Sequence, residues 1–344
     1  MNNKFFPANF MLISMLMMGT IMSLSSCNWL MMWMGLELNL MGILPLMNIK
    51  SKNLEIESSM KYFIIQSFSS SIFIISSMMM FTFSMTSFTM FNNNMFSSLM
   101  ILSLLMKLGS APFHLWLPSM CKFLSWMTLF LILTWQKLAP LFMLSSINLN
   151  FMIIMFTACL NAILGSIQAI NQTNIQLIMT YSSISHMSWM LPACYINMSI
   201  MLTYLCIYAL ISLNLFIYFS SKSNLFLYSL TQHNSMMNKD GMLILSLILS
   251  LSGIPPTLGF LSKLLIMILL INMKLIITCI ILFMGTLISL YFYLNLSMIL
   301  FIKSFMTFKY NTTNHTMKLI FTMNLLGTFM FLPMLMIYAM NIFN

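Results

Sequence analysis

The sequence predicts an all-α polytopic membrane protein in which residues 1–344 form a single transmembrane domain. Three observations support this fold class. Hydrophobic residues make up 60% of the 344-residue chain and charged residues only 5%, whereas soluble domains carry about 25% charged residues. Apolar runs of about 20 residues recur almost from end to end, and helices are the economical way to satisfy backbone polar groups in lipid. No stretch of the chain has the composition of a soluble domain.

The apolar runs are separated by polar residues or by Pro and Gly, which mark the expected ends of the helices. Reading the chain in this way gives about eleven transmembrane helices. They are predicted near residues 5–24, 26–47, 60–84, 94–118, 124–148, 150–171, 174–191, 196–220, 240–270, 275–302 and 318–342.

The distribution of lysines supports an odd number of spans. If the N-terminus lies on the inner side, the lysines outside the spans fall on that side and Lys274 alone lies outside, as the positive-inside rule requires. An even number of spans, or a missed span in the middle of the chain, would place lysines on both sides of the membrane and remove this asymmetry. The inner lysines are Lys4, Lys50, Lys52, Lys61, Lys122, Lys222, Lys239, Lys303, Lys309 and Lys318.

The composition also predicts where the protein is made. The chain has no arginine and no valine beside 44 Met and 30 Phe, a bias typical of an AT-rich animal mitochondrial genome. The N-terminus enters the first apolar run without an Arg-rich presequence. We expect a multi-pass protein of the mitochondrial inner membrane, with its N-terminus in the matrix and its C-terminus in the intermembrane space. Its net charge of +10 is scattered, so nucleic acid is not an expected partner.

Two of the predicted helices are discontinuous. Gly109 and Pro112 interrupt the fourth span, and a cluster of Gly and Pro between Gly253 and Gly259 interrupts the ninth. Irregular backbone at membrane depth is tolerated only inside the protein or beside a watery cavity. The two spans run in opposite directions, and paired broken helices of opposite orientation are typical of antiporter-like inverted repeats.

Three lysines lie deep inside apolar spans: Lys107, Lys137 and Lys263. Each ionised group at the centre of a spanning helix costs roughly 2.5 to 3.5 kcal/mol, so such residues are functional candidates. Lys137 is about ten residues from either end of its span, too far for its ammonium to reach the interface easily. Thr134 lies one turn before it on nearly the same face. The three lysines therefore predict a pathway for charge.

Glu37 lies near the middle of the second span without a local basic partner. Its least costly options are protonation or pairing with a lysine from another helix, and we expect the pairing. Burial disfavours the ammonium form of a lysine and a nearby carboxylate favours it, so a change in their separation would switch a proton on and off. The alternative is a static ion pair that holds helices together.

Two histidines also lie in the predicted spans. His186 has Ser182, Ser183 and Tyr181 nearby, and an imidazole among hydroxyls can relay protons; the alternative is a hydrogen-bonded core histidine. His114 follows the first break and fits a relay role or a structural role equally. His233 and His315 lie in polar loops and are expected to be solvated.

The six cysteines show no metal-ligand spacing and are interpreted as small buried hydrophobic residues. No phosphate-binding loop or catalytic triad has supporting context.

Several segments resemble the NADH dehydrogenase subunit 2 family of antiporter-like, proton-translocating membrane-arm subunits of mitochondrial complex I. The resemblance extends over essentially the whole chain, and LTWQKLAPL and KLGSAPFHLWLP are its most specific motifs. The other matching segments are MGLELNLMGILPL, YSSISHMSWM and LSGIPPTLGFLSK.

The resemblance implies that Glu37 and Lys107 form the charged pair beside the first broken helix. It implies that Lys137 is the central proton-carrying lysine, that Lys263 is the terminal one, and that a hydrated row of polar residues links them. It also implies a subunit of NADH:ubiquinone reductase that contacts other membrane-arm subunits, including neighbouring antiporter-like ones, and membrane lipids. FMN, iron-sulfur clusters and ubiquinone are expected elsewhere in that complex, with no cofactor bound by this chain.

Two other functions use the same residues: a stand-alone cation/proton antiporter, and a structural subunit that holds the membrane arm together. Two further classes are excluded. A haem-carrying cytochrome needs paired axial histidines, which two isolated histidines in spans do not supply. A rotary-synthase channel subunit is expected to carry a membrane arginine, and the chain has none.

Overall fold

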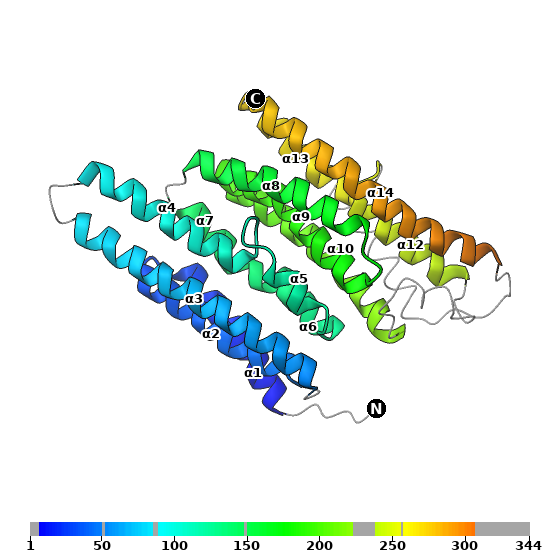
Figure 1. Cartoon of the computed structure of the whole chain (residues 1–344), viewed down its shortest axis with the longest axis horizontal. Helices are drawn as coiled ribbons and strands as arrows, with labels where there is room; N and C mark the ends of the chain where they lie inside the picture. The colour runs from blue at the N-terminus through cyan, green and yellow to red at the C-terminus, as the bar shows by residue number, and fades with distance from the viewer. Residues whose placement is uncertain are drawn as a thin grey trace.

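A computed structural model describes residues 7–49, 52–84, 89–147, 150–222, 238–255 and 257–306. Helices account for nearly all of these residues and lie side by side in a bundle (Figure 1). Within the described ranges, six helices are long and apolar enough to cross a membrane by length and composition. The predicted span at 318–342 lies outside the described residues, as do His233 and His315.

The helices follow the predicted order. Their bounds are α1 Pro7–Ser25, α2 Trp29–Met47, α3 Asn53–Ser84, α4 Thr89–Leu108, α5 Trp116–Cys121, α6 Trp126–Phe130, α7 Gln136–Ser146, α8 Phe151–Ile170, α9 Ile175–Ile196, α10 Met198–Lys222, α12 Asn238–Ser252, α13 Leu258–Asn272 and α14 Ile276–Met306. A π-helical turn, Leu131–Trp135, joins α6 to α7. The all-α polytopic fold is thus confirmed in the described part.

Helix α3 begins seven residues before its predicted start at residue 60, at Asn53. Its first two turns are polar, with Glu55 in the first turn, where a negative charge complements the helix dipole. Lys61 Nζ lies 2.6 Å from Glu57 Oε1, one turn away on an exposed surface. Local charge pairing therefore extends the helix beyond its apolar run, and hydropathy alone does not register that extension.

Both predicted breaks are present, and the two helices that precede them end in the same way. Gly109 follows α4 with φ +66°, and Gly253 follows α12 with φ +80°. In each case the glycine N–H donates to the carbonyl three residues back, and the next N–H donates to the carbonyl five residues before it. This pattern is the Schellman motif, which favours glycine because a side chain is strained at positive φ.

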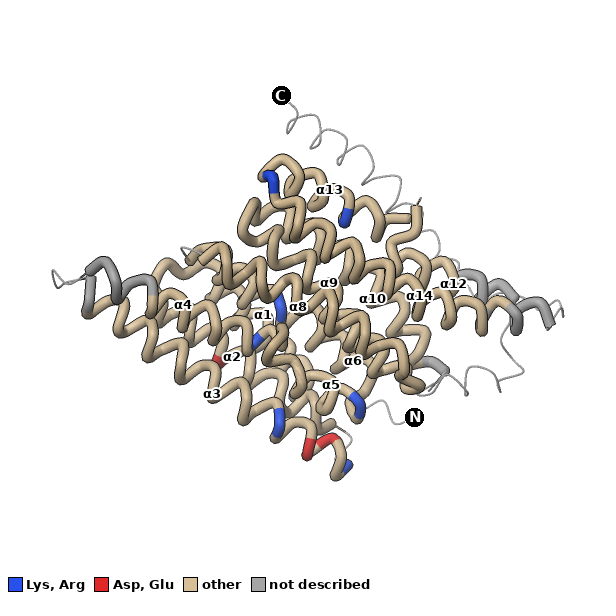
Figure 2. The backbone as a smooth tube through the Cα atoms, turned by 45° about the horizontal axis from the view of Figure 1, so that its top comes forward, with Lys and Arg blue, Asp and Glu red and all other residues tan. Residues whose placement is uncertain are grey.

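The two broken elements run in opposite directions through the bundle (Figure 1). The pair α4 and α5 belongs to the N-terminal half, and the pair α12 and α13 to the C-terminal half. Lysines occur at one end of the bundle, beside α3 and α5, and also within it (Figure 2). The opposite orientations agree with the inverted-repeat arrangement expected from the sequence.

Small residues allow the helices of each half to approach closely. A Cβ atom on Gly35 of α2 would lie 2.7 Å from the carbonyl oxygen of Gly19 on α1. A Cβ atom on Gly165 of α8 would lie 2.8 Å from the backbone nitrogen of Ser185 on α9. Helices α1 and α2, and likewise α8 and α9, therefore approach each other backbone to backbone at a glycine.

Candidate functional site

All three lysines predicted to lie inside the protein are buried. Lys107 is 8% exposed, Lys137 3% and Lys263 6%. In the part of the chain that the structure describes, none of them forms an ion pair, because the single ion pair there joins Lys61 to Glu57. Lys137 and Lys263 instead donate to backbone carbonyl oxygens of other helices.

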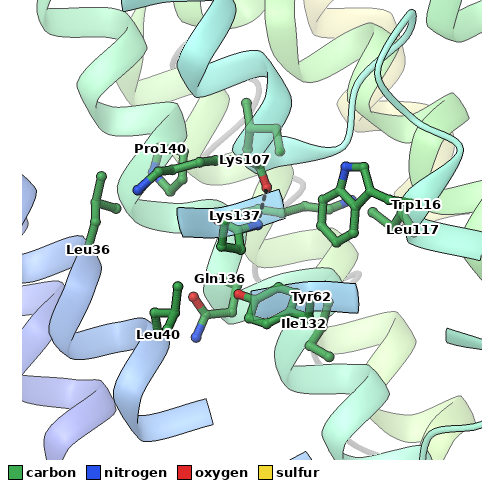
Figure 3. Close-up of a pocket in the computed structure, with 12 residues that line it drawn as sticks. Leu36, Leu40, Tyr62, Lys107, Trp116, Leu117, Ile132, Gln136, Lys137 and Pro140 are labelled. Atoms are coloured by element: carbon green, nitrogen blue, oxygen red, sulfur yellow. Dashed lines mark hydrogen bonds between the residues drawn. The ribbon is translucent and has the colours of Figure 1, made fainter. Parts of the chain in front are cut away.

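Lys107 and Lys137 line the same cavity, between α2, α3, α4, α5 and α7 (Figure 3). Polar side chains from Tyr62, Gln66 and Gln136 share this wall with apolar residues. The space open to the centre of a water molecule is about 20 Å³, which is enough for one water. Two lysines from different spans thus face one small wettable space, which we call the first cavity.

Lys107 is the penultimate residue of α4, two residues before Gly109. The last carbonyls of a helix lack partners within it. Gln66 of α3 supplies one, since its Nε2 donates to the Lys107 carbonyl oxygen at 3.2 Å. Gln66 therefore stabilises the broken end that presents Lys107 to the first cavity.

Lys137 lies between two irregularities in its helix. The π-helical turn Leu131–Trp135 precedes it, and Pro140 follows it within α7. Pro140 has no N–H, so the carbonyl four residues before it loses its usual helical partner. Sequence analysis missed the π turn. Such turns are frequent at functional sites, and the proline after the lysine was the available signal.

The ammonium of Lys137 contacts two groups on other helices. Its Nζ donates to the carbonyl oxygen of Ser183 on α9 at 3.3 Å and lies 5.9 Å from the ring centroid of Tyr208 on α10. Thr134, on nearly the same face as predicted, donates instead to the Phe130 carbonyl at 2.7 Å. Lys137 is thus held by a backbone carbonyl and an aromatic ring.

His186 and Lys263 line a second cavity, together with small and hydroxyl-bearing residues of α8, α9 and α14. The space open to a water centre is about 10 Å³, at the lower limit for one water. Sequence analysis placed the two residues in separate motifs, and the packing of α9, α13 and α14 brings them together. We call this space the second cavity.

The partner of His186 differs from the one expected. Ser182 and Ser183 each donate their hydroxyl to a backbone carbonyl of their own helix, at 2.7 Å. The imidazole Nδ1 instead shares a hydrogen bond with the Tyr204 hydroxyl on α10, at 2.8 Å. The His186 ring also packs against Tyr208, with 5.0 Å between centroids. Tyr204 and Tyr208, one turn apart, are neighbours of His186 that were not predicted from the sequence.

Lys263 closes the second break. Its Nζ donates to the Ser252 carbonyl oxygen, at the end of α12, at 2.8 Å. A cation at a helix C-terminus is favoured by the helix dipole and satisfies an orphan carbonyl. A Cβ atom on Gly253 would lie 2.9 Å from this Nζ. Gly253 therefore provides both the positive φ and the space that the ammonium needs.

Glu37 does not make the expected direct contact with a lysine. Its side chain is half-buried, and its Oε1 has no hydrogen-bond partner among the described residues. It is near enough to Lys107 for the two charges to interact, but the pair is not a salt bridge within the described part of the chain. Helices α2 and α4 both contact α3, and both contribute residues to the first cavity.

His114 lies in the first break and away from both cavities. Its Nε2 shares a hydrogen bond with Gln168 Oε1 on α8, at 3.0 Å. Asn161 Oδ1, seven residues earlier on the same face of α8, accepts from the Ala111 N–H at 2.5 Å. These two amides anchor the break to α8. Sequence analysis missed both, and polar side chains inside an apolar helix were the signal.

The cysteines fit the earlier interpretation only in part. Cys121, Cys194 and Cys279 are buried, whereas Cys27 and Cys206 are exposed. The two exposed thiols lie on the outer surface of this chain. A residue in or beside a membrane-spanning helix can face lipid or another subunit, so it need not be buried within its own chain. In the described ranges, no group of three His, Cys, Asp or Glu side chains is placed to hold a metal ion.

Comparison with known proteins shows the family to which this chain belongs. Residues 26–289 match the model of the family described as NADH:quinone oxidoreductase/Mrp antiporter, transmembrane. The chain belongs to this family. One family relative, NADH-ubiquinone oxidoreductase chain 2 of Aedes aegypti, is 41% identical over 343 residues, covering 98% of each chain.

Solved structures with the NADH:quinone oxidoreductase/Mrp antiporter fold are similar as well. A chain of respiratory complex I from Thermus thermophilus superposes with a TM-score of 0.79 at 21% identity, over 85% of this chain and 70% of that one. A chain of the Mrp complex from Dietzia gives 0.74 at 15% identity, over 83% and 59%. At these identities the likeness concerns the fold.

Proposed function

We propose that this chain is a proton-translocating, antiporter-like subunit in the membrane arm of NADH:ubiquinone oxidoreductase. The observation that carries the proposal is that Lys107 and Lys137, from two different spans, share a wettable cavity without a carboxylate ion pair. A lysine in such a place can take and release a proton, because no permanent counter-charge fixes its ammonium form. The family to which the chain belongs supports the same function.

The route we propose runs from Lys107 to Lys137 through the first cavity and from His186 to Lys263 through the second. Lys137 is the central carrier and Lys263 the terminal one. Glu37 acts on Lys107 through space, so a small helix movement changes the strength of their interaction. For His114 we propose a structural role, because its partner Gln168 holds the break and neither cavity includes it.

We propose that electron transfer occurs in other subunits, with FMN, iron-sulfur clusters and ubiquinone bound there and no redox centre in this chain. Its partners are neighbouring membrane-arm subunits, antiporter-like ones among them, and membrane lipids. The protein lies in the mitochondrial inner membrane, as its family relatives and its apolar helices support. The lysine distribution supports an N-terminus in the matrix and a C-terminus in the intermembrane space.

The test is Lys137→Met in the assembled complex, with NADH oxidation and proton uptake measured together. We expect normal assembly, because Met keeps the apolar stem, with fewer protons moved per NADH or a coupled loss of both rates. Lys61→Met, at an exposed ion pair, is the matched control and should change neither. Normal assembly with an unchanged proton-to-NADH ratio and rate would remove Lys137 from the route.

A further inference from the structure

We infer that the aromatic ring of Tyr208 is a barrier between the two cavities, which separates the water near Lys137 from the water near His186. This inference rests on the proposed proton route. Neither cavity includes Tyr208 in its lining. The ring nevertheless contacts Lys137 of the first cavity and His186 of the second. It therefore lies between the two cavities on the proposed route.

The contacts of the ring define this position. Its centroid lies 5.9 Å from Lys137 Nζ, within the range of a cation–π interaction. It lies 5.0 Å from the centroid of the His186 imidazole, within the range of aromatic packing. Tyr204 holds that imidazole in place through its hydrogen bond at 2.8 Å. The four side chains therefore form one packed unit between α7, α9 and α10.

The hydroxyl of Tyr208 is not a link in a hydrogen-bonded chain. Tyr208 is 3% exposed, and its Oη has no hydrogen-bond partner among the described residues. A proton relay needs donor and acceptor groups in contact. The ring, which contacts both neighbours, carries the role, and a proton passes from Lys137 toward His186 only when the ring moves or water enters beside it.

The inference predicts opposite results for two substitutions. Tyr208→Ala opens the gap, and we expect the assembled complex in liposomes to become several-fold more permeable to protons under an imposed pH gradient, without NADH. Tyr208→Phe keeps the ring and should leave both passive permeability and coupled proton uptake unchanged. Tyr218→Ala, on the same helix and also buried, creates a similar void outside both cavities and is the matched control.

Two outcomes would overturn the barrier. One is a Tyr208→Ala complex no more permeable than the Tyr218→Ala control. The other is a Tyr208→Phe complex that loses proton uptake, because the hydroxyl would then carry the proton. The Phe variant keeps the packing, so it tests the role of the hydroxyl even if the Ala variant does not assemble. Failure of the proposed function is distinct: it appears as unchanged pumping in Lys137→Met, whatever the Tyr208 variants do.

Discussion

Two of the buried lysines, Lys137 and Lys263, are held at membrane depth by neutral groups. Lys137 donates to the Ser183 carbonyl and faces the Tyr208 ring, and Lys263 donates to the Ser252 carbonyl at a helix end. A hydrogen bond to a charged group contributes about 1.5 to 3 kcal/mol, comparable to the roughly 2.5 to 3.5 kcal/mol cost of the buried charge. The hydrogen bond therefore offsets much of the cost of the buried ammonium, and a change in its geometry would raise that cost.

Glu37 gives the residue-scale prediction. A static ion pair predicts that Glu37→Gln assembles poorly, since the lysine would lose its partner. The absence of a salt bridge between Glu37 and Lys107 in the described residues favours the switch instead. We therefore expect Glu37→Gln to assemble normally and to slow NADH oxidation coupled to proton uptake. Abundance of the complex on native gels and its turnover, measured together, check this.

The control for Glu37→Gln is Glu57→Gln, which removes an exposed carboxylate of α3. Exposed ion pairs contribute about 0 to 1 kcal/mol, so both assembly and turnover should remain normal. A marked loss of assembled complex in Glu37→Gln alone would favour the static pair.

At the scale of elements, the two breaks are stabilised differently. The segment after α4 is held from outside by Asn161 and Gln168 of α8. The break after α12 is closed from within, by Lys263 of the helix that follows it. The positive charge of Lys263 stabilises the C-terminal end of α12. If Lys263 also carries a proton, its loss of that proton would weaken this end of the helix.

The anchoring of the first break is testable through Asn161→Leu. The substitution leaves the Ala111 N–H buried without its acceptor, which costs about 1 to 3 kcal/mol. We expect the midpoint of thermal dissociation of the membrane arm to fall. Asn171→Leu, at the exposed C-terminal end of α8, should leave the midpoint close to that of the unsubstituted protein. Equal midpoints for the two variants would argue against the anchor.

At the scale of the whole molecule, the route depends on helices far apart in sequence. The first cavity takes residues from α2, α3, α4, α5 and α7, and the second from α8, α9, α13 and α14. Helix α10 supplies Tyr204 and Tyr208 between them. Close helix packing at glycines sets these relative positions, since a shift of one helix moves every side chain that it carries.

Gly35→Val tests this dependence. The added side chain would meet the Gly19 carbonyl and the Ser23 backbone, 2.7 and 2.8 Å from the position of the new Cβ atom. Overpacking of this kind costs about 1 to 3 kcal/mol, so we expect less assembled complex. The adjacent Met34, which is 42% exposed, provides the control: Met34→Val should assemble normally. Quantifying assembled subunit in membranes distinguishes them, and equal amounts would contradict the prediction.

The sequence by itself was enough to predict the long helices of the described part, both breaks and the buried lysines. Long apolar runs have one stable solution in lipid, and a glycine after the last helical residue ends a helix locally. Such features depend on neighbours in sequence. The start of α3 and the π turn before Lys137 were missed because side-chain pairing and packing, rather than hydropathy, determine them.

Only the tertiary structure decided which groups meet. It placed Lys107 beside Lys137 and His186 beside Lys263, gave His186 the Tyr204 hydroxyl in place of the serines, and kept Glu37 out of direct contact with Lys107. Each of these relations joins residues on different helices. Their separation depends on how closely and at what angle the helices pack, and the pattern of apolar residues along one helix does not contain that information.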